Sequence, residues 1–215
     1  MRRRDFIAGG AATLMLAALP AWSRSLPPQV PAAAGALVEL INFSCARCFA
    51  VNAHRERLSA AAAQANLELR IAPVYWDNQS PWPSYAYYAA RNLSPQAAGY
   101  VLDELFAGMH QEGQKFEELS QVLAFLERRQ VPAALAEKGI TLHLPALAKE
   151  AASEAVKTSE LKAARLLALS GADEVPVFLW VREGEVKNIL HPGHADEPTA
   201  LVGVVITALN ESGKK

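Results

Sequence analysis

A long stretch of helical patterns between two strand-forming ends constrains the fold of this chain more than any other feature. Between residues 84 and 170 only helical patterns occur: Ala98 to Met109 and Leu119 to Leu126 each place apolar residues at helical spacing. Strand patterns lie before and after this stretch but not within it. This order predicts an α/β fold with an all-helical domain inserted into it.

The segment before the helical stretch predicts two strands joined by a helix. Ala36–Phe43 is short and rich in apolar residues, as a buried strand is, and Asn66–Trp76 has the same character. The alanine-rich segment 45–65 between them favours a helix. We therefore expect a parallel pair of strands with a crossover helix.

The segment after the helical stretch predicts a hairpin followed by a helix. Gly171 is a suitable cap for the last inserted helix, and Val175–Val181 is strongly β-prone. Residues 182–185 predict a hairpin turn, and residues 186–190 the returning strand. The last predicted element is an amphipathic helix that begins near Asp196.

Four segments follow from these patterns. Residues 36–83 and 171–210 are expected to form one domain, with residues 84–170 inserted between its two parts. The Pro- and Ala-rich residues 24–35 are expected to form a linker. Residues 1–23 are expected to be a signal peptide, since a basic start precedes an apolar run too short for a comfortable membrane span.

The basic start of the signal also bears on the export route. "RRDFI" (Arg3 to Ile7) resembles the twin-arginine export motif, whereas a general secretion signal that happens to carry arginines is the alternative. Either route leads to an oxidising compartment in which disulfides persist, and we expect the bacterial periplasm. The net charge of −1 does not favour a protein that binds nucleic acid, since such proteins usually carry an excess of basic residues.

Both cysteines of the chain, Cys45 and Cys48, lie where the first predicted strand meets its helix. A helix N-terminus carries partial positive charge, which favours a thiolate at Cys45, and Cys48 would resolve a mixed disulfide one turn later. An inert structural disulfide is disfavoured because the loop that it closes is too small to stabilise much. A metal site would need more ligands, and His54, His191 and His194 do not complete a set.

Three features in their order resemble the DsbA-like branch of the thioredoxin superfamily. They are "VELINFSCARCFAVNAH", the all-helical middle, and "GADEVPVFLW", and the resemblance spans roughly residues 36 to 209. It implies an α/β thioredoxin fold with an inserted helical domain. It also implies thiol:disulfide oxidoreductase activity, with the Cys45–Cys48 disulfide as the redox group and no other cofactor.

The resemblance assigns further residues around the thiols. It implies that Pro176 forms a cis peptide bond with Val175 beside Cys45 and helps to hold client backbone. The residues alone also allow Pro176 merely to begin an edge strand. It further implies that Glu39, inside the first predicted strand, is a buried acid that accepts the proton of Cys48. Alternatively, Glu39 faces solvent and pairs with Arg70, which would also limit its pKa rise.

The two residues between the cysteines depart from the family pattern, which has Pro-His there. Ala46 removes the proline of the turn, and Arg47 replaces a titrating His with a permanent charge. Arg47 favours a thiolate at Cys45 unless it turns into solvent, where screening weakens its charge. The direction of the redox reaction depends mainly on these two residues.

The expected protein is therefore an exported, monomeric enzyme that forms or exchanges disulfides in unfolded or partly folded clients. A membrane redox partner would reoxidise it. A disulfide isomerase or reductase is the alternative within redox chemistry, although only a linker precedes Ala36 where dimeric isomerases carry a dimerisation domain. A periplasmic metal- or client-binding protein is the alternative outside it. The aromatic segment Tyr75–Tyr88 is expected to pack between the two lobes and partly to line a client groove.

Overall fold

Four strands form one mixed sheet, and helices flank both of its faces in a computed structural model that describes residues 35–212. The predicted signal peptide and residues 24–34 of the predicted linker lie outside the described residues. The elements in chain order are β1 (Gly35–Ile41), α1 (Ala46–Asn52), α2 (Arg55–Gln64), β2 (Leu67–Pro73), α3 (Trp82–Leu93), α4 (Pro95–His110), α5 (Leu119–Arg128), α6 (Val131–Ala136), α7 (Leu144–Ala151), α8 (Glu154–Ser170), β3 (Val177–Arg182), β4 (Glu185–Leu190), the 3₁₀ turn η1 (Pro192–His194) and α9 (Pro198–Ser212).

The sheet has the strand order β2-β1-β3-β4. β1 and β2 are parallel, as the sequence predicted for two strands joined by a helical crossover. β3 runs antiparallel to β1 and returns through a tight hairpin to β4, again as predicted. Glu183 and Gly184 form the turn with positive φ angles, a conformation that glycine adopts without steric cost.

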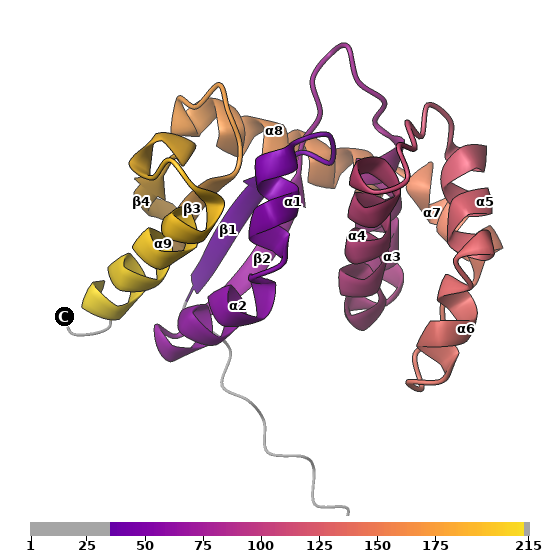
Figure 1. The fold of residues 1–215 in the computed structure, drawn as a ribbon, viewed down its shortest axis with the longest axis horizontal. Helices are drawn as coiled ribbons and strands as arrows, with labels where there is room; N and C mark the ends of the chain where they lie inside the picture. Colours follow the sequence, from indigo (N-terminus) through magenta and orange to yellow (C-terminus); the bar gives the residue numbers. More distant parts are fainter. Residues whose placement is uncertain (1–34, 213–215) are drawn as a thin grey trace, which may run out of the picture. The chain divides into compact units, whose positions relative to one another are not determined.

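Two hydrophobic layers sandwich the sheet. On one face, α2 and α9 cover apolar residues of β1 and β3, among them Leu37, Phe178 and Trp180 (Figure 1). Val38 and Leu179 belong instead to a larger core that continues into the helical segment. This division follows from the alternation of side chains along a strand, because neighbouring residues point to opposite faces.

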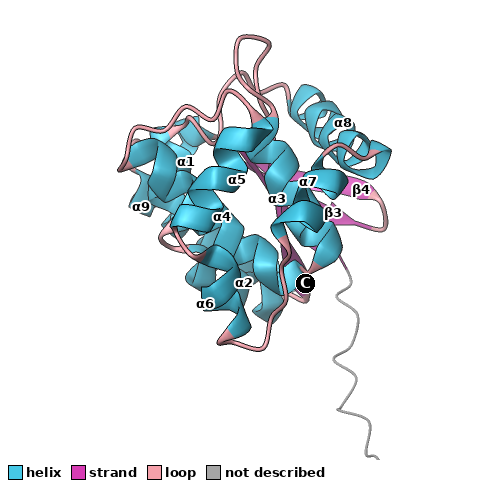
Figure 2. Cartoon of the chain, turned by 90° about the vertical axis from the view of Figure 1, so that its right-hand side faces the viewer, coloured by secondary structure: helices cyan, strands magenta, loops and turns pink. Residues whose placement is uncertain are grey.

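The helical segment between β2 and β3 packs around α3, which contacts α4, α5, α7 and α8 (Figure 2). α3 also joins this segment to the sheet. The Tyr88 hydroxyl donates to the carbonyl of Pro73 at 2.8 Å, and the Tyr87 hydroxyl donates to that of Ile71. The predicted packing role of the aromatic segment is therefore confirmed for these two tyrosines.

The single helix predicted for residues 45–65 is wrong in one respect. The chain forms two helices, α1 and α2, separated by a turn at Ala53 and His54. The N–H of His54 bonds to the carbonyl of Val51, which tightens the end of α1 to a three-residue turn and redirects the chain. Elsewhere Gly171 ends α8 in the left-handed conformation, as predicted. No helix within residues 35–212 combines the length and apolar character needed to span a bilayer.

Candidate active site

Cys45 occupies the N-cap position of α1, directly after the turn that follows β1. Its sulfur accepts a hydrogen bond from the N–H of Cys48 at 3.2 Å. This is the position at which unpaired backbone N–H groups point towards a negative group. Cys45 is partly exposed, whereas Cys48 is fully buried, and both thiols are free in this structure. The first thiol is accessible and the second is not.

The two thiols are electrostatically unequal. The pKa of Cys45 falls to about 7, chiefly because the Cys48 side chain donates a hydrogen bond to its thiolate, helped by the N–H groups of Cys48 and Arg47 and by the Arg47 charge. Burial opposes this shift. The pKa of Cys48 rises well above its ordinary value because the thiol is desolvated and donates a hydrogen bond to Cys45. Cys45 is therefore the thiol of the pair that ionises more readily at neutral pH.

The Val175–Pro176 segment lies against the reactive thiol. The peptide bond between the two residues is cis, as the family resemblance implied. Cys45 donates its S–H to the carbonyl of Val175 at 3.3 Å. The loop between α8 and β3 thus reaches the start of α1, although Cys45 and Val175 are 130 positions apart in the chain.

Glu39 lies in the middle of β1 and is only 2% exposed. The solvent-facing alternative for this residue is therefore wrong. Burial raises the pKa of Glu39 to about 8, and the positive charge of Arg55 opposes the rise. The charge of Glu39 in turn contributes to the raised pKa of Cys48, which places the buried acid within electrostatic reach of the buried thiol.

The predicted pairing of Arg70 with Glu39 is also wrong. Arg70 donates to Glu68 at 2.6 Å, and the Arg70 side chain is 59% exposed. The strand register explains the error: Arg70 lies beside Val38, while Glu39 lies beside Ile71. Adjacent register positions face opposite sides of the sheet, so Arg70 points away from the acid.

Arg55 takes the place that the sequence prediction gave to Arg70. It begins α2 and is held by three hydrogen bonds, two to the carboxylate of Asp103 on α4 and one to the side chain of Asn52. Its charge acts on Glu39 from this position. The break between α1 and α2 turns Arg55 to this side, and that break was not predicted from the sequence.

Arg47 does not turn into solvent. Its guanidinium donates to the backbone carbonyls of Ala195 and Asp196, the latter at 2.8 Å, in the segment that precedes α9. The charge is therefore held beside the CxxC turn, although it is the smallest of the influences that lower the pKa of Cys45. Ala46 opens α1 and is exposed.

Two further residues that the sequence analysis missed hold the loop before Cys45. Buried Asn42 donates to the carbonyl of Val74 at 3.0 Å and to the side chain of Gln79, and it accepts from the N–H of Ser44. On the other side, His110 at the end of α4 contacts the carbonyl of Phe43 at 2.9 Å. The only sequence signal for Asn42 was its position: it is a polar residue directly before "FSC", at the end of an apolar strand.

His110 also contacts α1 itself. Its ring stacks on that of Phe49, the residue after Cys48, with centroids 4.9 Å apart. The inserted helical segment therefore contacts both ends of the CxxC turn. Figure 1 shows the end of β1, the start of α1 and the loops after β2 and α4 at the same end of the sheet.

A pocket of about 380 Å³ opens beside Cys45. Its lining consists of Asn42, Ser44, Cys45, Arg47, Trp76, Gln79, Asp173, Glu174 and Val175. Trp76 is the only aromatic residue in this lining, and polar and apolar surface contribute about equally to it. Trp76 thus lies where the predicted client groove would be, and its role in holding a client stays a prediction.

The three histidines considered as metal ligands lie outside α1, the helix that carries the thiols. His191 and His194 stack on each other with ring centroids 5.8 Å apart, and His54 lies in the turn before α2. Within the described part of the chain, no group of three or more His, Cys, Asp or Glu side chains gathers as a metal site would require.

Solved structures with the same architecture include DsbA-type proteins. Reduced DsbA1 from Neisseria meningitidis matches with a TM-score of 0.62 at 11% identity, over 88% of this chain and 89% of that one. Oxidoreductase DsbA from Xylella fastidiosa matches with a TM-score of 0.62 at 14% identity, over 86% and 90%. The cytosolic disulfide reductase DsbM from Pseudomonas aeruginosa matches with a TM-score of 0.57 at 18% identity, over 81% and 98%.

These matches define the class of fold. The chain has a thioredoxin fold with a helical insertion, as DsbA structures have, and the predicted fold is confirmed. No family model matches the chain. No curated protein matches it either.

Proposed function

We propose that this protein is a thiol:disulfide oxidoreductase in which Cys45 exchanges disulfides with client proteins. The observation that carries the proposal is the inequality of the two thiols: an accessible N-cap cysteine of low pKa lies beside a buried cysteine of high pKa. An inert staple or a pair of metal ligands has no need of this inequality, whereas exchange requires it.

The exchange cycle uses the two sulfurs in turn. A client thiolate attacks Cys45 of the oxidised pair, the Cys45–Cys48 bond breaks, and its electron pair leaves on the sulfur of Cys48. A second client thiolate then attacks the client sulfur of the mixed disulfide and releases the Cys45 thiolate. The client loses two electrons and the enzyme gains them, so no cofactor is required.

Glu39 is the proposed proton acceptor for Cys48 in the reverse direction. When Cys48 attacks a mixed disulfide on Cys45, its buried thiol must lose a proton. Glu39 is buried near it, and a pKa of about 8 lets the carboxyl both take and release a proton near neutral pH. Pro176 and Val175, which flank Cys45, are the proposed residues that hold client backbone.

The pKa of Cys45 bears on the direction of the reaction. A strongly oxidising pair has a nucleophilic thiol with a pKa of about 3.5, and a reducing pair one of about 7. The pKa of Cys45, about 7, stabilises the reduced form only modestly. We therefore expect a reduction potential between about −270 and −180 mV, which suits exchange or reduction better than strong oxidation.

Equilibration in glutathione buffers tests the proposal. The protein is incubated at graded ratios of reduced to oxidised glutathione, acid-quenched, and weighed by mass spectrometry for the Cys45–Cys48 disulfide. We expect a reversible transition of two electrons, and a Cys48→Ala variant that accumulates a mixed disulfide with glutathione on Cys45. A pair that stays reduced or oxidised at every ratio would rule the proposal out.

The cellular setting belongs to the same proposal. The signal-like residues 1–23 support export to the periplasm, with thiol-containing clients and a membrane partner that renews the oxidised pair. We propose that the enzyme acts there as a monomer. Fractionation of cells that express the full chain tests this location, with the Arg3→Lys and Arg4→Lys double variant as the test of twin-arginine export.

A further inference from the structure

The pocket beside Cys45 carries charges that the exchange chemistry does not use. Asp173 and Glu174 lie in the loop between α8 and β3, and both line this pocket with exposed side chains. Within residues 35–212, neither carboxylate makes a hydrogen bond or an ion pair. These two unpaired carboxylates place negative charge in the pocket that contains Cys45.

The other charged residue of the pocket does not neutralise them. The guanidinium of Arg47 is directed to the carbonyls of Ala195 and Asp196 and forms no ion pair with Asp173 or Glu174. The carboxylates therefore remain open to a ligand. Their position in a pocket that contains Cys45 places such a ligand next to the sulfur that exchanges.

Trp76 provides an independent indication of the ligand. It lines the same pocket, and among the described residues no Lys or Arg lies over its ring, although four other aromatic rings of the chain carry such a contact. The face of an indole attracts a cation more strongly than any other aromatic side chain does. An indole together with two carboxylates is a set of groups that suits the side chain of lysine or arginine.

We propose that this pocket selects client cysteines that have a lysine or arginine close by in the client chain. This inference rests on the proposed exchange function and names its substrate class: an extended, cationic client segment. The basic side chain binds between Trp76 and the carboxylates of Asp173 and Glu174, and so places the client sulfur against Cys45. Exposed charges also steer such a client towards the pocket before contact.

The chemistry of the selected step is the attack described above. The client thiolate displaces Cys48 from Cys45, one S–S bond forms as another breaks, and the departing Cys48 sulfur takes up a proton from the Glu39 carboxyl. The cationic side chain of the client takes no part in bond making. It acts only by raising the occupancy of the pocket and by shielding the client thiolate from the two carboxylates.

Peptides that differ only in charge test the proposal. Two synthetic peptides carry one cysteine flanked by two lysines or by two glutamates, and a third carries two serines. Oxidised protein is mixed with each, and the second-order rate of mixed-disulfide formation is followed by acid quench and mass spectrometry. Each rate is divided by that of the same peptide with the neutral hydroxyethyl disulfide, which removes the effect of charge on the peptide thiol itself.

We expect the lysine peptide to react faster than the glutamate peptide by about fivefold at low salt, since each exposed charge pair contributes little in water. The ratio should fall towards one at about 0.5 M salt. In the Asp173→Asn, Glu174→Gln double variant it should fall towards one at low salt. Trp76→Leu should weaken the preference for the lysine peptide over the glutamate peptide.

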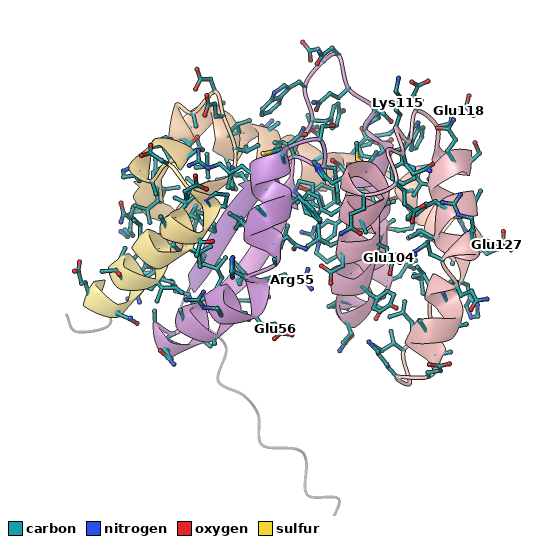
Figure 3. The ribbon with its side chains drawn as sticks, in the orientation of Figure 1. Arg55, Glu56, Glu104, Lys115, Glu118 and Glu127 are labelled. Carbon is teal, nitrogen blue, oxygen red and sulfur yellow. The ribbon has the colours of Figure 1, made fainter. Side chains whose placement is uncertain are left out.

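A matched variant separates the pocket from overall charge. Glu127→Gln with Glu137→Gln removes the same net charge from exposed positions of the helical segment, and Figure 3 shows Glu127 on α5. This variant should keep the full preference. Equal normalised rates for the three peptides with the unmodified protein would overturn the inference but leave the exchange function intact. A protein that reacts with none of them, and with no glutathione, would overturn both.

Discussion

At the scale of single residues, the shared hydrogen bond between the two thiols separates their pKa values. It is the largest influence that lowers the pKa of Cys45, and it also contributes to the raised pKa of Cys48. The Cys45 thiolate is thus stabilised mostly by the side chain of Cys48. The surrounding charges act as smaller corrections.

Loss of the Cys48 thiol should therefore raise the pKa of Cys45. We expect the Cys48→Ala variant to have a Cys45 pKa about one unit higher than the reduced wild type, because its largest stabilising partner is gone. Thiolate absorbance at 240 nm, followed from pH 4 to pH 10, measures the shift. An unchanged midpoint near pH 7 would show that the helix N-terminus, rather than Cys48, holds the thiolate.

Substitution of Arg47 should have a smaller effect than loss of Cys48. Its charge is the last of the causes that lower the pKa of Cys45. We expect Arg47→Met to raise that pKa by about half a unit, which corresponds to about 0.7 kcal/mol and a reduction potential lower by about 15 mV. Arg47→Lys should restore only part of the shift, because an ammonium cannot donate to the two carbonyls in the same fixed geometry.

Glu39 should make the stability of the protein depend on pH. Its folded pKa of about 8 lies above the value of 4.5 expected for an exposed glutamate, so the folded state binds the proton more tightly. The stabilisation is complete below about pH 4.5 and is lost as the pH rises through about 8. The loss amounts to about 5 kcal/mol at most, from 1.36 kcal/mol per unit of pKa.

Urea unfolding at pH 5 and pH 8.5 checks this expectation. A Cys45→Ser background removes the titration of the reactive thiol, and Glu39→Gln in that background should lose most of the difference between the two pH values. Arg55→Met should move the transition to higher pH, because the charge that opposes the raised pKa of Glu39 is gone. Equal pH dependence with and without Glu39 would contradict a buried, protonated acid.

At the scale of elements, α4 connects the helical insertion to the thiol-bearing helix. Its Asp103 holds Arg55 at the start of α2, and its His110 stacks on Phe49 in α1. The Arg55–Asp103 pair is partly exposed, so we assign it a positioning role more than a large contribution to stability. The insertion thus helps to fix the surroundings of both Glu39 and the CxxC turn.

The close packing of α4 makes a specific stability prediction. A Cβ atom at Gly108 would lie 2.7 Å from a ring carbon of Phe125 and 2.9 Å from one of Phe116. We expect Gly108→Ala to lower the free energy of unfolding by about 1–3 kcal/mol, since two buried rings must shift. Urea denaturation measures the change.

Gly203 is the matched control for Gly108. It also lies inside a helix, α9, but a Cβ atom there would meet nothing within 4 Å. Gly203→Ala should raise stability by up to about 1 kcal/mol, because alanine favours the helix more than glycine does. If both variants lost stability equally, the contact with the two phenylalanines would not be the cause of the loss.

At the scale of the whole molecule, the sequence predicted the order of elements well because that order depends on local patterns. The period of apolar residues identified the strands and the long helical segment, and the thiols at the end of β1 followed from the spacing of Cys45 and Cys48. The cis bond at Pro176 came from the family resemblance instead. A dipeptide alone does not distinguish it from an ordinary strand start.

Contacts that depend on the strand register or on a break between helices could not be predicted from the sequence. Arg70 and Arg55 are both basic, and only the pairing of β1 with β2 and the break after α1 decide which of them acts on Glu39. The carboxylates of Asp173 and Glu174 had no pattern of their own. Their significance arises from the pocket, which combines loops far apart in sequence.

The hydrogen bonds from Arg47 to Ala195 and Asp196 limit how the length of the chain can change there. Surface loops usually accept insertions and deletions, and the connection between β4 and α9 looks like such a loop. Here its backbone carbonyls accept hydrogen bonds from Arg47, which lies between the two cysteines and is 148 and 149 positions away in the chain. A length change in this connection should alter the redox pair while sparing the hydrophobic core, so lineages free to lengthen their other loops are expected to keep this one fixed.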